Sequence, residues 1–115
     1  MDQRTTALPE ALRRGLEEAV ERIVELAGPQ AVILFGSRAE GRAGSESDVD
    51  LLVVAETDQP FHLAARLMPP VRDALAGHHA DVVVITPADW ERLRHIPGQV
   101  VHEAAQYGVR LYEAA

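Results

Sequence analysis

Apolar residues are spaced in two ways along this chain, and the two spacings predict a mixture of helices and strands. Recurrence every three or four residues is typical of a helix with one buried face, whereas short continuous apolar runs are typical of buried strands. The helical spacing predicts helices over residues 9–27, 61–68, 71–76, 88–95 and 97–106. The apolar runs predict strands over 31–35, 48–54 and 81–86, and alternation predicts a final edge strand over 109–113.

The connection between the second and third strands indicates part of the topology. Residues 56–77 are numerous enough to return the chain to a parallel strand through a helical crossover. Pro69-Pro70 should end or kink the first helix of this crossover, because proline lacks an N–H donor and clashes with the preceding turn. The order of elements predicts an α/β (α+β) fold, a small mixed β-sheet packed with helices, in one domain over residues 1–115.

Composition excludes several kinds of chemistry. The chain has no cysteine, so disulfides, thiolate metal sites and cysteine nucleophiles are excluded. It also has no lysine among its eleven basic residues, which excludes the lysine-containing phosphate loop. A formal net charge of −7 argues against general nucleic-acid binding. No apolar run reaches membrane-spanning length and the N-terminal residues lack a signal-peptide pattern, so a cytoplasmic location without membrane contact is expected.

The residues with the clearest chemical use lie between the first two strands. The first strand ends at Gly36-Ser37, where glycine lets the backbone approach a ligand closely and serine offers a hydroxyl group. Asp48 and Asp50 open the second strand, and their spacing of two residues directs both carboxylates to one face. A divalent cation between the two carboxylates would remove their repulsion. A phosphate site next to a metal site predicts nucleotide chemistry.

Topology makes a third carboxylate possible at this site. The end of the first strand can meet the start of the second only if the two strands are antiparallel. If the crossover then returns a strand parallel to the second, Asp81 opens that strand at the same edge as Asp48. We therefore expect Asp48, Asp50 and Asp81 to converge on one edge of the sheet.

Three further features lie near the candidate site, and the last two have more than one interpretation. A short helix over residues 37–40 is expected to direct its N-terminus to the phosphate site. Arg38 and Arg42 could contact triphosphate oxygens or only neutralise the carboxylates. His78-His79 could contact a ligand from the loop before Asp81, but a plain loop is the preferred interpretation.

Gly36-Ser37, ten intervening residues and Asp48-x-Asp50 together resemble the motif of the polymerase-beta-type nucleotidyltransferase superfamily. The fuller string is most similar to the minimal nucleotidyltransferase (MNT) family, whose members are often antitoxin partners of HEPN-domain toxins. The resemblance implies a polymerase-beta palm-like fold with two Mg²⁺ ions, or Mn²⁺. Asp48 and Asp50 would bind both ions, and Asp81 only the catalytic one. Gly36, Ser37 and Arg38 would bind the nucleotide.

The same resemblance implies an activity. A nucleoside monophosphate, expected to be AMP from ATP, would be transferred to a hydroxyl group, on a partner toxin of a type VII-like toxin–antitoxin system. Asp81 would help the acceptor hydroxyl lose its proton. Three alternatives remain open: a small-molecule nucleotidyltransferase of the aminoglycoside-modifying kind, a non-catalytic antitoxin that acts by occlusion, and a plain α/β domain with incidental acidic turns. Homo- or hetero-oligomers are both possible.

A partner surface is expected in the last third of the chain. Trp90, Ile96, Tyr107 and Leu111 are apolar positions that the predicted core does not obviously need, and together they could form an exposed patch. An acidic chain also suits a basic, RNA-directed toxin, because opposite charges speed encounter.

Overall fold

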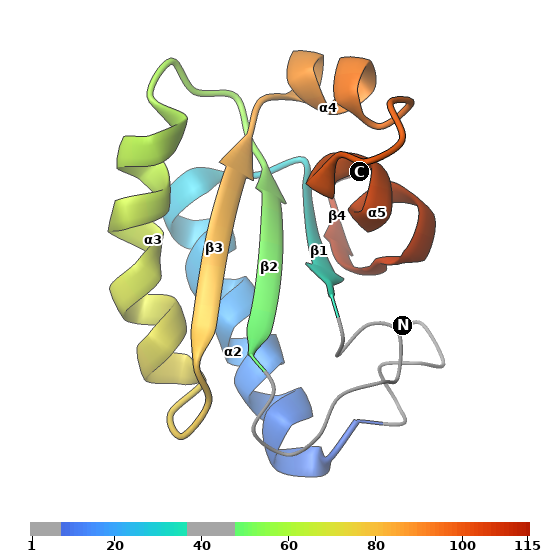
Figure 1. Ribbon diagram of the computed structural model, residues 1–115. Helices are drawn as coiled ribbons and strands as arrows, with labels where there is room; N and C mark the ends of the chain where they lie inside the picture. Colours follow the sequence, from blue (N-terminus) through green and yellow to red (C-terminus); the bar gives the residue numbers. More distant parts are fainter. Residues whose placement is uncertain (1–7, 37–47) are drawn as a thin grey trace.

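The computed structural model describes residues 8–36 and 48–115, which form four helices and four strands (Figure 1). In chain order the elements are α2 (Glu10–Ala27), β1 (Ala31–Phe35), β2 (Val49–Val54), α3 (Pro60–Ala74), β3 (Ala80–Ile85), α4 (Pro87–Leu93), α5 (Val100–Tyr107) and β4 (Val109–Glu113). Three features predicted from the sequence lie outside the described residues: the short helix over 37–40, Ser37, and the arginines Arg38 and Arg42.

The strands form one mixed sheet in the order β3-β2-β1-β4. β1 is antiparallel to both β2 and β4, and β2 is parallel to β3. The antiparallel first pair and the parallel crossover strand, both predicted from the sequence, are confirmed. This topology brings the end of β1 and the starts of β2 and β3 to the same edge of the sheet.

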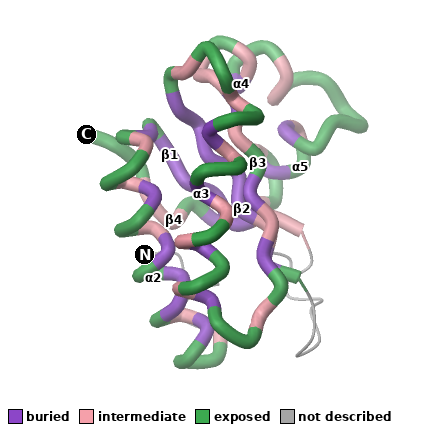
Figure 2. Tube along the Cα trace, turned by 90° about the vertical axis from the view of Figure 1, so that its left-hand side faces the viewer, coloured by how far each residue is buried: buried purple, intermediate pink, exposed green. Residues whose placement is uncertain are grey.

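Helices cover the two faces of the sheet unequally. α2 and α3 pack on one face, against a continuous apolar layer in which every second strand residue takes part. The buried strand residues of this layer are Val32, Leu34, Val49, Leu51, Val53, Ala80, Val82 and Val109. Figure 2 shows the buried positions along the strands and the inner sides of these helices, with exposed positions on their outer sides.

The opposite face carries a smaller apolar cluster. Strand residues Ile33, Leu52, Val54 and Ile85 pack there with Trp90 of α4 and with α5. This cluster lies toward the ends of β2 and β3. Nearer the starts of these strands the same face carries Asp50 and Asp81, both incompletely buried. Helical cover among the described residues therefore leaves the carboxylate edge accessible (Figure 1).

The crossover differs from the sequence prediction. One helix, α3, continues through Pro69 and Pro70. Of the two outcomes predicted for these prolines, an end or a kink, the helix end is therefore wrong, and so is the separate helix over 71–76. The buried positions Leu63, Leu67 and Val71 continue across the prolines at four-residue spacing, so packing favours a continuous helix. Pro69 is exposed, so a helix carbonyl left without its N–H partner on that side can be hydrated.

The last third of the chain contains the second correction. Trp90, predicted as part of an exposed patch, is only 6% exposed and packs in the smaller apolar cluster. The helix that carries it, α4, begins with a capping contact, in which the Thr86 hydroxyl accepts a hydrogen bond of 3.2 Å from the Asp89 N–H. Leu111 is partly buried against the larger core, whereas Ile96 and Tyr107 are exposed as expected. Of the four residues predicted for the patch, Ile96 and Tyr107 are therefore the two that remain exposed.

Within residues 8–36 and 48–115, none of the helices combines the length and the apolar character that a membrane span requires.

Candidate active site

Three aspartates meet at the edge of the sheet where β2 and β3 begin. Asp50 and Asp81 are direct partners in the parallel register of the two strands. Asp48 precedes β2 and lies two residues before Asp50, so strand alternation directs both side chains to the same face. The Val49 N–H donates a hydrogen bond of 2.8 Å to the His79 carbonyl, which joins the chain beside Asp48 to the start of β3. The structure therefore brings together the three carboxylates predicted from the sequence.

Gly36 closes the site from the end of β1. Phe35 is the register partner of Asp50, so Gly36 follows directly beside that carboxylate. Its φ of +78° lies in the left-handed region, and a Cβ built there would be 2.8 Å from Oδ2 of Asp50. The backbone conformation therefore favours glycine here, and an added Cβ would have to displace the Asp50 carboxylate. Of the predicted nucleotide-binding residues, Gly36 is the one that the described structure contains.

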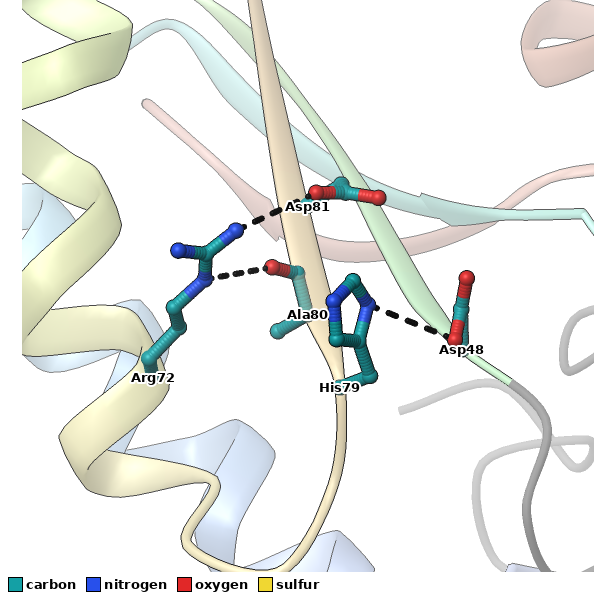
Figure 3. Close-up of polar contacts among 5 residues, drawn as sticks. All are labelled: Asp48, Arg72, His79, Ala80 and Asp81. Carbon is teal, nitrogen blue, oxygen red and sulfur yellow. Dashed lines mark hydrogen bonds and ion pairs between the residues drawn. The ribbon is translucent and has the colours of Figure 1, made fainter.

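A basic side chain contacts Asp81 from the helix beside β3. Arg72 of α3 donates a hydrogen bond of 3.0 Å from Nε to the Ala80 carbonyl, and its Nη2 lies 3.4 Å from Oδ1 of Asp81 (Figure 3). Both side chains of this ion pair are about half exposed, so the pair should stabilise the fold little. Its two contacts orient the guanidinium, and with it the Asp81 carboxylate.

His79 is a site residue, although its sequence position favours a plain loop over contact with a ligand. Its Nδ1 lies 3.4 Å from Oδ1 of Asp48, and Figure 3 shows the ring directed toward that carboxylate. Ligand atoms of Asp48, His79 and Asp81 all lie within 4.8 Å of one another. A sequence signal for this placement exists, because His79 lies two residues before Asp81 at the start of a strand and so projects to the same face. No comparable signal identifies Arg72, nine residues before Asp81.

The electrostatics of the site are clearest at Asp50. Partial burial, followed by the nearby charges of Asp81 and Asp48, raises the pKa of the Asp50 carboxyl above its ordinary value, and His79 opposes this shift. The ionised carboxylate is therefore less favourable in the folded protein than in the unfolded chain. A cation bound among these carboxylates would reverse that penalty.

This shift predicts how stability depends on pH. With a raised folded pKa, the Asp50 contribution to stability is fully present below the ordinary value of 3.8 and is lost as the pH rises through the folded pKa. Metal-free Asp50→Asn protein should therefore melt at a higher temperature than wild type at pH 7, with a difference that shrinks toward pH 3.8. Thermal melts in chelator across this range check it. Asp58→Asn, an exposed change of the same kind, should show no such trend.

The donor set fits a divalent cation. Carboxylate oxygens are the preferred ligands of Mg²⁺ and also suit Mn²⁺. Asp48, Asp50 and Asp81 supply such oxygens from the starts of two adjacent strands. Three carboxylates close together give the site an excess of negative charge, which a cation would neutralise. A cation held there would lie beside Gly36, where the backbone can closely approach a phosphate.

Comparison with known proteins identifies the family of the chain. Residues 14–104 match the family model of the nucleotidyltransferase domain, and the chain belongs to this family. A candidate nucleotidyltransferase from Sulfolobus solfataricus has a similar structure, with 21% sequence identity, a TM-score of 0.57, and coverage of 98% of this chain and 90% of that one. A crystal structure of a toxin–antitoxin with AMP-PNP contains a chain with 20% identity and a TM-score of 0.52. That match covers 85% of this chain and 73% of the other.

No curated protein sequence shows significant similarity to the chain. At these identities the structural likenesses establish the fold, which confirms the predicted mixed α/β nucleotidyltransferase architecture. The family match establishes the general class, a nucleotidyltransferase domain.

Proposed function

We propose that this protein transfers AMP from ATP to a hydroxyl group of a partner toxin, with the three aspartates as its catalytic centre. The observation that carries the proposal is the convergence of Asp48, Asp50 and Asp81 on one sheet edge beside the left-handed Gly36. Paired carboxylates next to a close-approach glycine suit a metal-assisted attack on a phosphate ester.

Each residue has a stated task in this reaction. Mg²⁺ held by Asp48, Asp50 and Asp81 would supply charge stabilisation to the phosphates. The Gly36 N–H and the Ser37 hydroxyl would bind the β- and γ-phosphates, and Arg38 would contact the same oxygens. Two ions are proposed, as in the resembled family, with Asp81 binding only the catalytic one.

The chemical step is a substitution at the α-phosphorus. The acceptor hydroxyl gives its proton to Asp81 and its oxygen forms a bond to the α-phosphorus. The bond from that phosphorus to the bridging oxygen breaks, and pyrophosphate leaves with the electron pair. Arg72 assists by orienting Asp81 through its two contacts, while Asp81 remains about half exposed and so open to an incoming acceptor.

A protein acceptor is supported by two observations. The similar structure crystallised with AMP-PNP is a toxin–antitoxin, which makes a toxin a suitable partner class for this chain. The net charge of −7 complements a basic RNA-directed protein, as a HEPN-type toxin would be.

The partner experiment tests the proposal directly. HEPN-type partner incubated with the protein, ATP and Mg²⁺ should gain the mass of one or more nucleoside monophosphates, and intact-mass spectrometry measures this gain. Asp48→Asn protein should leave the partner unmodified, whereas the matched surface variant Asp58→Asn should modify it as wild type does. If the toxin is bound and silenced without any change of mass, the protein acts by occlusion and the proposed transfer is wrong.

A further inference from the structure

We propose that His79 is a metal ligand, which completes with Asp48 and Asp81 a site selective for a divalent cation that accepts nitrogen, Mn²⁺ in preference to Mg²⁺. The inference concerns the metal of the proposed active site and to that extent rests on the proposed function. It adds a ligand outside the three aspartates, and it assigns a preference among metals.

The separations of the three side chains suit one shared cation. For an octahedral cation with bonds of about 2.1 Å, neighbouring ligand atoms are about 3.0 Å apart and opposite ones about 4.2 Å. The observed 3.4 Å between Nδ1 of His79 and Oδ1 of Asp48 is close to the first of these separations. The three ligand atoms lie within 4.8 Å of one another, so small side-chain rotations bring them to a common centre.

The backbone holds His79 in this position from both sides. Its carbonyl accepts the hydrogen bond from the Val49 N–H, and the next carbonyl, of Ala80, accepts one from Arg72. On the other side the His78 N–H donates to the Leu75 carbonyl at 2.9 Å. The His79 side chain is 65% exposed, so its ring can turn to a cation without disturbing the core.

Ligand chemistry gives the metal preference. Mg²⁺ strongly favours oxygen ligands, whereas first-row divalent ions from Mn²⁺ onward bind imidazole nitrogen more readily. Two carboxylates and one imidazole on adjacent backbone segments form a set that such an ion accepts. The alternative is that His79 only pairs with Asp48 as an imidazolium, in which case no nitrogen would enter the coordination sphere.

Pulsed electron paramagnetic resonance of bound Mn²⁺ separates these two cases, because a coordinated imidazole modulates the electron spin echo through its ¹⁴N nucleus. Mn²⁺ alone is added to wild type, His79→Gln and His78→Gln, all untagged and in nitrogen-free buffer. The ¹⁴N modulation should be present in wild type and in His78→Gln, the matched control from the same loop, and absent in His79→Gln. The ratio of Mn²⁺ to Mg²⁺ affinities should fall by at least about tenfold in His79→Gln.

Several results would overturn the inference: no Mn²⁺ binding or no ¹⁴N modulation in wild type, modulation that persists in His79→Gln, or an unchanged affinity ratio. These outcomes are distinct from failure of the proposed function. If the partner still gains nucleotide while wild-type Mn²⁺ shows no nitrogen coupling, the function stands and the His79 assignment fails. If the coupling is present but no partner is modified, the ligand assignment stands and the transfer proposal fails.

Discussion

Asp50→Asn is expected to reduce nucleotidyl transfer by about a thousandfold or more, without loss of the fold. Metal-assisted charge stabilisation contributes several kcal/mol to such reactions, and each 1.36 kcal/mol corresponds to about tenfold in rate. Asp50 is the central carboxylate, beside Gly36 and in register with Asp81, so its loss should weaken both metal and phosphate binding. Single-turnover transfer to the partner, followed by intact mass, measures the rate.

The same variant also has an internal control for folding. Because Asp50 is less favourable when charged in the folded state, its removal should leave the metal-free protein at least as stable as wild type. A thermal melt in chelator therefore separates lost chemistry from lost structure. Near-wild-type transfer by a folded Asp50→Asn protein would remove Asp50 from the catalytic centre, and Asp58→Asn should be indistinguishable from wild type in both measurements.

The strands are the elements that the sequence predicts most accurately, because burial on both faces of the sheet requires continuous apolar runs. β1 and β4 have the predicted bounds, and β2 and β3 each begin and end one residue or less from the prediction. Continuous β-branched runs bounded by glycine and aspartate fit buried strands better than helices of that length. The antiparallel pairing of β1 with β2 and the parallel pairing of β2 with β3 could be predicted because they bring the end of β1 and the starts of β2 and β3 to one site. The structure confirms both pairings.

The errors arose where tertiary packing outweighed local rules. Proline normally ends a helix, but in α3 the continuous buried stripe from Leu63 to Val71 outweighs the missing donors of Pro69 and Pro70. The sequence predicts Trp90 in an exposed patch because the predicted core does not obviously need it. In the structure the second face of the sheet has its own apolar cluster, and Trp90 packs in that cluster. In both cases the deciding partner lies on another element, which local spacing does not reveal.

Some residues of the candidate site could be predicted from local spacing, and others depend on tertiary packing. The spacing of Asp48 and Asp50, and the strand that starts at Asp81, were readable because each carboxylate opens a predicted strand. Arg72 could not be found in this way, since its contact with Asp81 depends on how α3 packs beside β3. His79 lies beside this edge of like charges and offsets part of the rise in the pKa of Asp50, which is caused first by burial and then by the charges of Asp81 and Asp48.

Gly36→Val is expected to weaken Mg²⁺–ATP binding by about a hundredfold, more than Ser37→Ala. A side chain at Gly36 would displace Oδ2 of Asp50, and in the proposed site it would also occupy the space through which the backbone would approach a phosphate. In the proposed site the Ser37 hydroxyl supplies one of several hydrogen bonds to the phosphates, so its loss should cost about 1.5 kcal/mol, or about tenfold in affinity. Isothermal titration calorimetry measures both affinities.

Backbone strain alone could also weaken binding, and Gly28→Val isolates it. Gly28 has a φ of +53° at the other end of β1, but a Cβ there meets no atom within 4 Å. Both valine variants should therefore lose about 1–2 kcal/mol of stability from the left-handed conformation, while only Gly36→Val should lose nucleotide affinity. Equal affinities for Gly36→Val, Gly28→Val and wild type would exclude a phosphate cradle at Gly36. Equal losses in both variants would instead attribute the effect to strain.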